Sequence, residues 1–399
     1  MWAMAESEII YLDNNATTQL DSAVIEEMLP FLTKYYGNPS SGYGFAATAR
    51  KAINLARERL AALLGCEPVE IVFTSGGTES NNAAINSALQ LVARGGHVVT
   101  SSVEHSAVLR PCQDLAKRGC DVTFLGLDRH GNLDLAELEA AIRPGTALVS
   151  IMWANNETGV VFPIEKIAEI CHEKRALFHT DAVQATGKIP MRLRDSPINF
   201  LSLSAHKFHG PKGVGALYVS RQTRLSPLIA GGGQENGRRG GTENVASIVG
   251  LGKAAELAFK YVAEDKCNIR SMRDRFEKSA LGAVSGASIN GAGAVRLPNT
   301  SSISFEGIES ASALLLLDRQ GICCSAGSAC RTGSQDASHV LRAMNPSSDG
   351  ARRSLRFSLG RFNTDAQIDR AIEVVPKVIE KLRQSTAPRP AATALRATP

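Results

Sequence analysis

The sequence predicts an α/β protein with a mostly parallel sheet, helices on both faces of that sheet, and a second, smaller α/β unit. From about residue 45 to residue 260, helix-like and strand-like segments alternate. Such alternation is typical of parallel sheets, because a helix returns the chain to the start of each new strand. Near residues 251–265 we expect one long connecting helix, and a shorter α/β pattern follows it.

Apolar periodicity and the turn residues between segments predict the individual elements. In the first part we expect helices over residues 46–64, 79–93, 105–118, 134–142 and 164–174. Strand-like segments lie at residues 70–74, 97–101, 121–125, 147–153, 176–180, 200–204 and 214–219. The smaller unit contains an apolar segment at residues 299–305 and predicted helices at residues 310–320 and 365–382.

These patterns divide the chain into two domains and a tail. We expect a large domain over residues 15–262 and a small domain made of residues 1–14 and 263–383. The remaining residues, 384–399, are rich in Ala, Pro and Thr, a composition that favours disorder.

Composition and charge exclude several classes of protein. Hydrophobic residues make up 44% and charged residues 21% of the 399 positions, as in ordinary globular proteins. The net charge of +5 comes without a dense Lys/Arg run, so nothing indicates nucleic-acid binding. The apolar run 313–317 is too short to span a membrane, and the first residues lack the features of a signal or transit peptide. We therefore expect a cytoplasmic protein.

Polar residues of distinct chemistry follow five of the predicted strands. They are Thr78, His105, Asn156, Asp181 and Lys207. From Thr78 to His105 is 27 residues, and from Asp181 to Lys207 is 26. Because one such residue follows each strand-helix unit, the set should lie along one edge of the sheet, where ligands of parallel sheets bind.

Lys207 is the most informative of these residues. It ends an apolar run and precedes the turn Gly210-Pro211-Lys212-Gly213, which places an amine at the edge of a core. Burial disfavours the ammonium and leaves a neutral amine that can form a Schiff base with a carbonyl. The alternative is a lysine that extends from a strand end into solvent.

The other residues also have ordinary structural explanations. Thr78 could cap a helix after a glycine turn, and Asp181 could cap the helix that follows it. Asn156 could stabilise a turn, and His105 could be a buried histidine without a catalytic role.

One cofactor accounts for the whole set, and that cofactor is pyridoxal phosphate. It requires a lysine for its aldehyde, a carboxylate for its pyridinium nitrogen and an anion-binding segment for its phosphate. Asp181 and Lys207 supply the first two groups. Ser75-Gly76-Gly77-Thr78-Glu79 opens a helix and can bind the phosphate through backbone N–H groups.

Motifs along nearly the whole chain, from about Ile10 to Leu382, resemble those of a known family. The segments Ser204-Ala205-His206-Lys207 and Thr180-Asp181-Ala182-Val183-Gln184 are similar to those of fold-type I pyridoxal-phosphate enzymes of the class V aminotransferase group. More narrowly, the chain resembles cysteine desulfurases of the NifS/IscS type in Tyr11-Leu12-Asp13-Asn14-Asn15-Ala16-Thr17-Thr18, Gly37-Asn38-Pro39-Ser40-Ser41, Glu104-His105, Asn155-Asn156-Glu157-Thr158-Gly159 and Arg356-Phe357-Ser358-Leu359-Gly360-Arg361.

The resemblance implies roles for these positions. Lys207 would carry the cofactor as a Schiff base, Asp181 would pair with the pyridinium nitrogen, and His105 would stack on the ring and assist proton transfers. Gln184 and Asn156 would contact the phenolic oxygen. Residues 15–262 would then be the pyridoxal-phosphate-binding domain.

Phosphate and substrate contacts are implied in the same way. Phosphate would be bound by Thr78, Ser204, His206 and the backbone of Gly77 and Thr78. Thr242 matches a threonine that reaches the phosphate of a neighbouring subunit, which implies a homodimer with shared active sites. Arg356, together with Asn156, would hold the substrate carboxylate, a bidentate task suited to a guanidinium.

Cys330 selects the reaction among those that pyridoxal phosphate permits. The eight cysteines form no CxxC pair, so neither a metal site nor a disulfide framework is expected, and most should be small buried side chains. Cys330 differs because it lies in a loop of small and polar residues, 325–334, that we expect to be exposed and mobile. Its neighbour Arg331 would favour the thiolate, although the family often has Thr or Ser at that place.

The loop resembles the persulfide-forming loop of the NifS/IscS group, carried on the small domain. The implied reaction takes sulfur from L-cysteine onto Cys330 as a persulfide and releases L-alanine, while Lys207 moves the α-proton. The sulfur would go to an iron–sulfur scaffold or another acceptor protein. Cys323 and Cys324 are expected to be buried at a strand end.

Two other interpretations remain open from the sequence. A class V aminotransferase or selenocysteine lyase would use the same cofactor but would not depend on Cys330. A non-catalytic sulfur-transfer or assembly platform would have no need of both Lys207 and Cys330. The sequence does not separate a nitrogenase-specific role from a housekeeping one, and tRNA thiolation is a further use of the sulfur.

Overall fold

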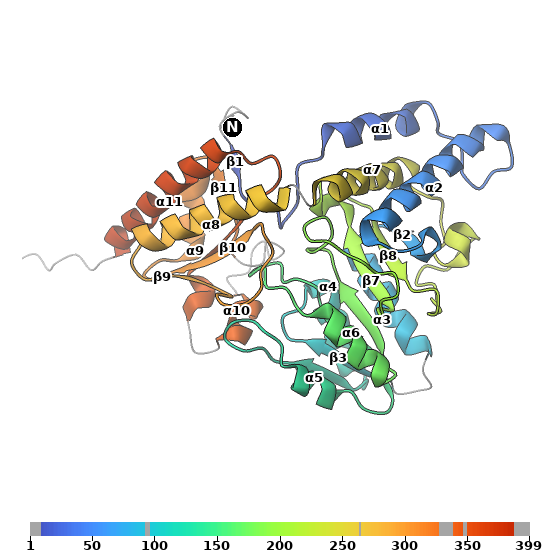
Figure 1. Cartoon of the computed structure of the whole chain (residues 1–399), viewed down its shortest axis with the longest axis horizontal. Helices are drawn as coiled ribbons and strands as arrows, with labels where there is room; N and C mark the ends of the chain where they lie inside the picture. The colour runs from blue at the N-terminus through green and yellow to red at the C-terminus, as the bar shows by residue number, and fades with distance from the viewer. Residues whose placement is uncertain (1–8, 92–95, 263–264, 327–337, 346–348, 387–399) are drawn as a thin grey trace, which may run out of the picture.

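The computed structural model describes residues 9–91, 96–262, 265–326, 338–345 and 349–386 of the 399-residue chain. Figure 1 shows two units side by side, joined near the N-terminal segment and the end of α7. The larger unit is built around a seven-stranded sheet and the smaller one around a three-stranded sheet.

The large sheet has the strand order β2-β8-β7-β6-β5-β3-β4. Its strands are β2 (Ile71–Thr74), β3 (His97–Ser101), β4 (Val122–Leu125), β5 (Thr146–Ser150), β6 (Leu177–Asp181), β7 (Phe200–Ser204) and β8 (Gly215–Val219). β8 is antiparallel to both β2 and β7, and the pairs from β7 across to β4 are parallel. The prediction of a mostly parallel sheet is therefore confirmed.

Helices cover both faces of this sheet. α3 (Gly77–Leu91) and α4 (Ser106–Lys117) pack on one face, while α2 (Gly44–Leu64), α5 (Leu135–Ala141), α6 (Ile164–Glu173) and α7 (Val245–Tyr261) pack on the other. Alternate residues of a strand supply the two cores: Val72 joins the α3 side, whereas Ile71 and Phe73 join the α2 side. Every residue of β2 is buried, as a sheet covered on both faces requires.

The smaller unit has its own apolar core. Its antiparallel sheet has the order β12 (Ser354–Ser358), β10 (Thr300–Phe305) and β9 (Ala287–Ile289). α8 (Asp265–Ala283), α9 (Ser310–Asp318) and α11 (Asp365–Thr386) surround it. The N-terminal strand β1 (Ile10–Tyr11) pairs with β11 (Ile322–Cys323), and Ile10 and Leu12 enter this core. On these grounds we propose domain boundaries at residues 15 and 262.

Two helical regions differ from the sequence prediction. The single connecting helix at residues 251–265 is wrong, because α7 ends at Tyr261 and α8 begins at Asp265. α1 (Ser22–Thr33) was not predicted; it contains Pro30, and its cap comes from Asp21, which accepts from the Ala23 N–H. The short helix α10 (His339–Met344) agrees with the sequence, whose pattern predicts a helix that includes Val340 and Leu341, and both residues pack in the core of the larger unit.

No helix within the described ranges combines the length and apolarity that a membrane span requires.

Candidate active site

The carboxyl ends of the parallel strands open onto a cavity of about 490 Å³. A cavity of this size suits a small-molecule ligand. Sequence-predicted residues that line it are Gly77, Thr78, His105, Asn156, Asp181, Gln184, Ser204, His206, Lys207 and Arg356. The structure thus brings together all of the predicted site residues except Thr242 and Cys330.

Lys207 ends a short 3₁₀ turn, Ala205–Lys207, directly after β7. Its half-buried amine donates hydrogen bonds to the backbone carbonyls of Asn15, at 2.6 Å, and Ala16, at 2.8 Å. The turn is tight: a Cβ on Gly210 would lie 2.9 Å from the Ala205 carbonyl oxygen, so only glycine fits there without a shift. The backbone therefore fixes where the amine emerges into the cavity.

Asp181 is the last residue of β6 and is 5% exposed. Its Oδ2 accepts from Asn81 Nδ2 at 2.7 Å, and its Oδ1 accepts from the Val183 N–H at 3.0 Å. Both contacts fix the orientation of the carboxyl group at the cavity wall. A carboxylate held in this way can pair with a protonated ring nitrogen.

The start of α3 forms an anion-binding segment. Gly76 has a φ of +152°, and α3 begins at Gly77, so N–H groups of its first turn lack helical partners. A Cβ on Gly77 would lie 2.7 Å from Val183 Cγ2, which shows how closely the backbone lines the cavity. Ser204, at the end of β7, supplies a hydroxyl beside this segment.

The imidazole ring of His206, which lines the cavity, is uncharged at neutral pH. Burial, together with the charges of Lys207, Lys212 and Lys188, lowers its pKa to about 4. Its Nδ1 lies 3.1 Å from Thr17 Oγ1. At neutral pH it can therefore contact a phosphate as a hydrogen-bond partner and not as a cation.

His105 is the N-cap of α4, and its Nδ1 accepts from the Ala107 N–H at 3.2 Å. The neutral ring therefore carries its proton on Nε2. The preceding residue, Glu104, is fully buried, and its Oε1 accepts from Ser101 Oγ and from the Met152 N–H. Burial raises the pKa of Glu104 to about 8, so this carboxyl is largely protonated at neutral pH.

Arg356 approaches the cavity from β12 in the smaller unit, and it is 2% exposed. Its Nη1 donates to the backbone carbonyl of Asn156 at 2.9 Å, and its Nη2 donates to Asp13 Oδ1 at 2.6 Å. Its Nε has no hydrogen-bond partner within the described residues. The guanidinium is thus held in place and can bind a carboxylate.

The remaining two predicted residues lie elsewhere. Thr242 lines a separate cavity of about 220 Å³, together with Ser75 and Arg239. Cys330 lies outside the described residues. Near it in sequence, Cys323 and Cys324 are half-buried, and burial raises the pKa of both thiols.

Sequence reasoning missed several residues of the site. Asn81 contacts Asp181, Asp13 contacts Arg356, and Lys188 donates to Gln184 Oε1 at 2.7 Å and to Asn15 Oδ1 at 3.0 Å. Two of them had a sequence signal: Asn81 lies two residues after the segment 75–79, and Asp13 belongs to the N-terminal motif at residues 11–18. Lys188 carried no sequence signal.

These groups fit pyridoxal phosphate. The cavity offers an amine, a carboxylate and an anion-binding helix start, and Asn81 Oδ1 is a buried oxygen without a partner among the described residues. No cluster of His, Cys, Asp and Glu that could hold a metal occurs in the described ranges. The donor set therefore favours an organic, phosphorylated cofactor over a metal ion.

The chain is similar to known proteins over most of its length. Residues 10–371 match the family model described as Aminotransferase class-V. The chain is 53% identical over 375 residues to a cysteine desulfurase of Trichormus azollae, with 94% of each chain covered. It is 48% identical to the cysteine desulfurase NifS of Azotobacter vinelandii over 375 residues, 94% of this chain and 93% of that one. A solved structure titled NIFS-LIKE PROTEIN superimposes with a TM-score of 0.88 at 38% identity, covering 94% of this chain and 100% of the other.

Proposed function

Because the chain belongs to the class-V aminotransferase family and, within it, to the cysteine desulfurases, we propose that the cavity around Lys207 is where it removes sulfur from L-cysteine. The observation that carries this proposal is that Lys207, Asp181 and Arg356 line one cavity. They are an amine, a carboxylate and a carboxylate-binding guanidinium, contributed by two units of the chain.

The cofactor of this site is pyridoxal phosphate. Lys207 would hold its aldehyde, Asp181 its ring nitrogen, and His105 would cover its ring. Gln184 and Asn156 would contact the phenolic oxygen, while the phosphate would be bound by Gly77, Thr78, Ser204 and His206. When bound, the cofactor supplies an electron-accepting ring that makes the α-proton of an amino acid acidic.

Arg356 would orient the substrate by its carboxylate. Its Nη1 and Nη2 already point at oxygen acceptors, the Asn156 carbonyl and Asp13 Oδ1. A substrate carboxylate can use the same donors in bidentate fashion. This fixes the amino acid so that its α-carbon faces Lys207.

Lys207 and His105 would move the protons. The Lys207 amine can take the α-proton of cysteine and return a proton to the product. The proton of the His105 ring lies on Nε2, because Nδ1 accepts from Ala107. The Asp181 carboxylate, held by Asn81, would favour positive charge on the ring nitrogen of the bound cofactor.

Cys330 would receive the sulfur. Its thiolate attacks the sulfur of the substrate, an S–S bond forms, and the C–S bond of the substrate breaks. The electron pair of that bond stays with the carbon, which takes up protons to give L-alanine. Cysteine and enzyme thiol thus become alanine and enzyme persulfide, with no outside oxidant.

A homodimer would complete the site. Large apolar side chains that are 45–76% exposed gather on α1, on the start of α2 and between them: Ile25, Leu29, Leu32, Tyr36, Tyr43 and Phe45. Exposed apolar surface of this kind supports a protein contact. Thr242, in its separate cavity, would then serve the phosphate of the partner subunit. The sulfur would pass to an iron–sulfur scaffold or another acceptor protein in the cytoplasm.

Mass spectrometry after incubation with L-cysteine tests this function. The peptide that contains Cys330 should gain one sulfur atom, and Cys330→Ala should abolish sulfide release while the cofactor stays bound. Cys120→Ala, at a half-buried thiol outside the cavity, is the matched control and should behave as wild type. Undiminished sulfide release by Cys330→Ala would refute the role of this thiol.

A further inference from the structure

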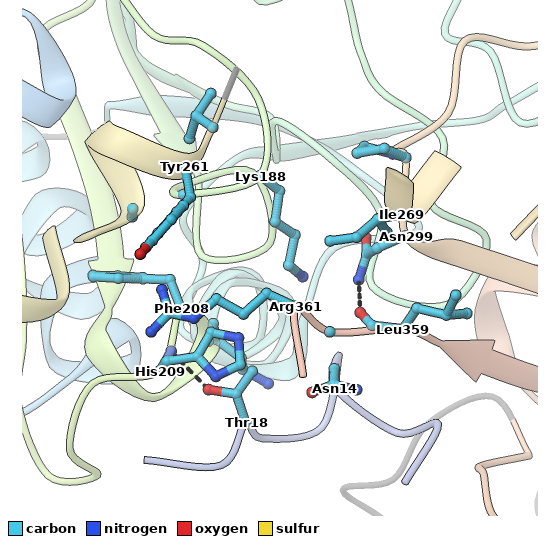
Figure 2. Close-up of a pocket in the computed structure, with 16 residues that line it drawn as sticks. Asn14, Thr18, Lys188, Phe208, His209, Tyr261, Ile269, Asn299, Leu359 and Arg361 are labelled. Carbon is cyan, nitrogen blue, oxygen red and sulfur yellow. Dashed lines mark hydrogen bonds between the residues drawn. The ribbon is translucent and has the colours of Figure 1, made fainter. Parts of the chain in front are cut away.

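Lys188 is a half-buried lysine that the proposed reaction does not use. It extends into a small cavity of about 60 Å³ between the two units, where Asn299 and Arg361 also lie (Figure 2). Lys207 is the one residue, among those described, that lines both this cavity and the reaction cavity. Lys188 therefore stands behind the reacting lysine and does not reach the substrate cavity itself.

The Lys188 amine contacts two side-chain amides. It donates to Gln184 Oε1 at 2.7 Å and to Asn15 Oδ1 at 3.0 Å. The ammonium form of a lysine can only donate, and the neutral amine still has two N–H groups, one for each oxygen. In these contacts each amide turns its oxygen toward Lys188 and its nitrogen away.

The amide nitrogens then point at the reaction site. Gln184 Nε2 donates to the Asn15 carbonyl at 2.9 Å, the same carbonyl that accepts from Lys207. Asn15 Nδ2 donates to the Asn156 carbonyl at 3.2 Å, which also accepts from Arg356. Asn15 Oδ1 also accepts from Asn299 Nδ2 at 3.1 Å, and Asn15 Nδ2 also donates to Thr300 Oγ1 at 2.9 Å. Lys188 therefore shares the orientation of Asn15 with these two residues, while it is the donor to Gln184 Oε1 on the cofactor side.

We propose that Lys188 is a positioning residue that holds Gln184 and Asn15 with their amide nitrogens toward the reaction site. This rests on the proposed function, in which Gln184 donates to the phenolic oxygen of the cofactor. Without Lys188 the Gln184 amide can rotate and present its oxygen, which repels the phenolic oxygen instead of donating to it.

Several charged groups surround Lys188 and enter any titration of the site. They are Lys207 and His206 after β7, the neighbouring His209, Arg356 on β12, and Arg361 with its ion-pair partner Asp21. Burial lowers the pKa of Lys188, and the charges of Lys207 and Arg356 lower it further. The contacts to the two amides persist in either state of the amine.

The pH titration of the visible absorption of the cofactor-loaded protein tests the proposal. When the phenolic oxygen of the cofactor loses a hydrogen-bond donor, it binds the proton on the neighbouring Lys207 nitrogen more strongly. Lys188→Met should therefore raise the midpoint of the colour change by on the order of one pH unit. Lys188→Arg, which keeps the donors, should restore the wild-type midpoint. Lys212→Met is the matched control, because Lys212 is an exposed lysine near His206 that touches neither amide, and it should titrate as wild type.

A double-mutant cycle separates positioning from a general loss of charge. Gln184→Met has no N–H to donate and adds no charge, so it should raise the midpoint as Lys188→Met does. In the Gln184→Met background, Lys188→Met should add no further shift. An additive shift would show that Lys188 acts independently of Gln184 and would overturn the inference.

Folding and cofactor binding are checked in the same samples. If Lys188→Met does not fold, Lys188→Gln fills similar space with a group that both donates and accepts, and the same upward shift is expected. An unchanged midpoint in the folded variant, beside a shifted Gln184→Met, would overturn the inference alone. A wild-type protein without any cofactor absorption would overturn the proposed function and the inference with it.

Discussion

Arg356 and Asp13 form a buried ion pair beside the reaction cavity, with Nη2 and Oδ1 2.6 Å apart, although 343 positions separate them in the sequence. The other carboxylate oxygen of Asp13 accepts from Ser325 Oγ at 2.8 Å. Asp13 therefore ties Arg356, which we propose binds the substrate carboxylate, to the segment that leads toward Cys330. The N-terminal strand β1 brings it there through its pairing with β11.

Removal of the Asp13 carboxylate should impair substrate binding and stability together. In Asp13→Ala, Arg356 keeps its charge in a buried place but loses its partner, which costs about 3 kcal/mol of unfolding free energy. The KM for L-cysteine should rise, because the guanidinium is no longer held. Denaturant unfolding and steady-state kinetics measure both effects. Asp369→Asn, which breaks an exposed ion pair with Arg275, should cost less than about 1 kcal/mol.

Glu104 should make the folded protein less stable as the pH rises. The folded carboxyl has a pKa of about 8, raised by burial from an ordinary value of 4.5, so between these values the folded state binds more protons than the unfolded state. Its contribution to the unfolding free energy therefore falls from about pH 4.5 to about pH 8. Glu104→Gln should remove this fall.

Unfolding free energies of wild type and Glu104→Gln, measured side by side across that range, isolate this contribution. The buried histidines change in the opposite sense: burial lowers the pKa of His206 to about 4, so its contribution increases as the pH rises from there to the ordinary value of 6.5. The difference between the two proteins cancels that effect. Parallel pH profiles would contradict a neutral Glu104.

Asn81 should hold the Asp181 carboxylate in place for the cofactor. In Asn81→Leu, Asp181 Oδ2 loses its side-chain donor, so the carboxylate is less well held and binds a protonated ring nitrogen more weakly. Hydrogen bonds to charged groups contribute about 1.5–3 kcal/mol, so pyridoxal phosphate should bind roughly ten- to a hundredfold more weakly. Titration of the cofactor-free protein with pyridoxal phosphate measures this, and unaltered affinity would exclude the role.

Glu235 should stabilise the loop that leads to Thr242. It is 7% exposed, has a φ of +48°, and accepts from Arg57 and from the Phe73 N–H. Glu235→Gln weakens a buried pair and should lower the unfolding free energy by about 3 kcal/mol. In contrast, Glu67→Gln removes the carboxylate from exposed pairs with Arg194 and Arg221 and should change it by less than about 1 kcal/mol. Equal losses in urea unfolding would argue against this role.

Local sequence patterns were sufficient to predict most helices and strands of the larger unit. The predicted strands at residues 97–101 and 200–204 coincide with β3 and β7, because continuous apolar runs are what a doubly covered sheet requires. Lys207 and Asp181 were predicted to share one edge, since the carboxyl ends of parallel strands meet there. α1 was missed because Pro30 interrupts its pattern, and its place is fixed by packing on α7.

The amino-acid order determined by itself the alternating fold, the strand-end polar residues and the resemblance to cysteine desulfurases, because each depends on neighbours within one strand-helix unit. Only the tertiary structure decided which side chains hold these strand-end polar residues in place. Asn81 meets Asp181 across 100 positions, and Lys188 meets Asn15 across 173. Such contacts follow from how the sheet, the helices and the small unit pack in space, and no local periodicity encodes a hydrogen bond between residues so far apart.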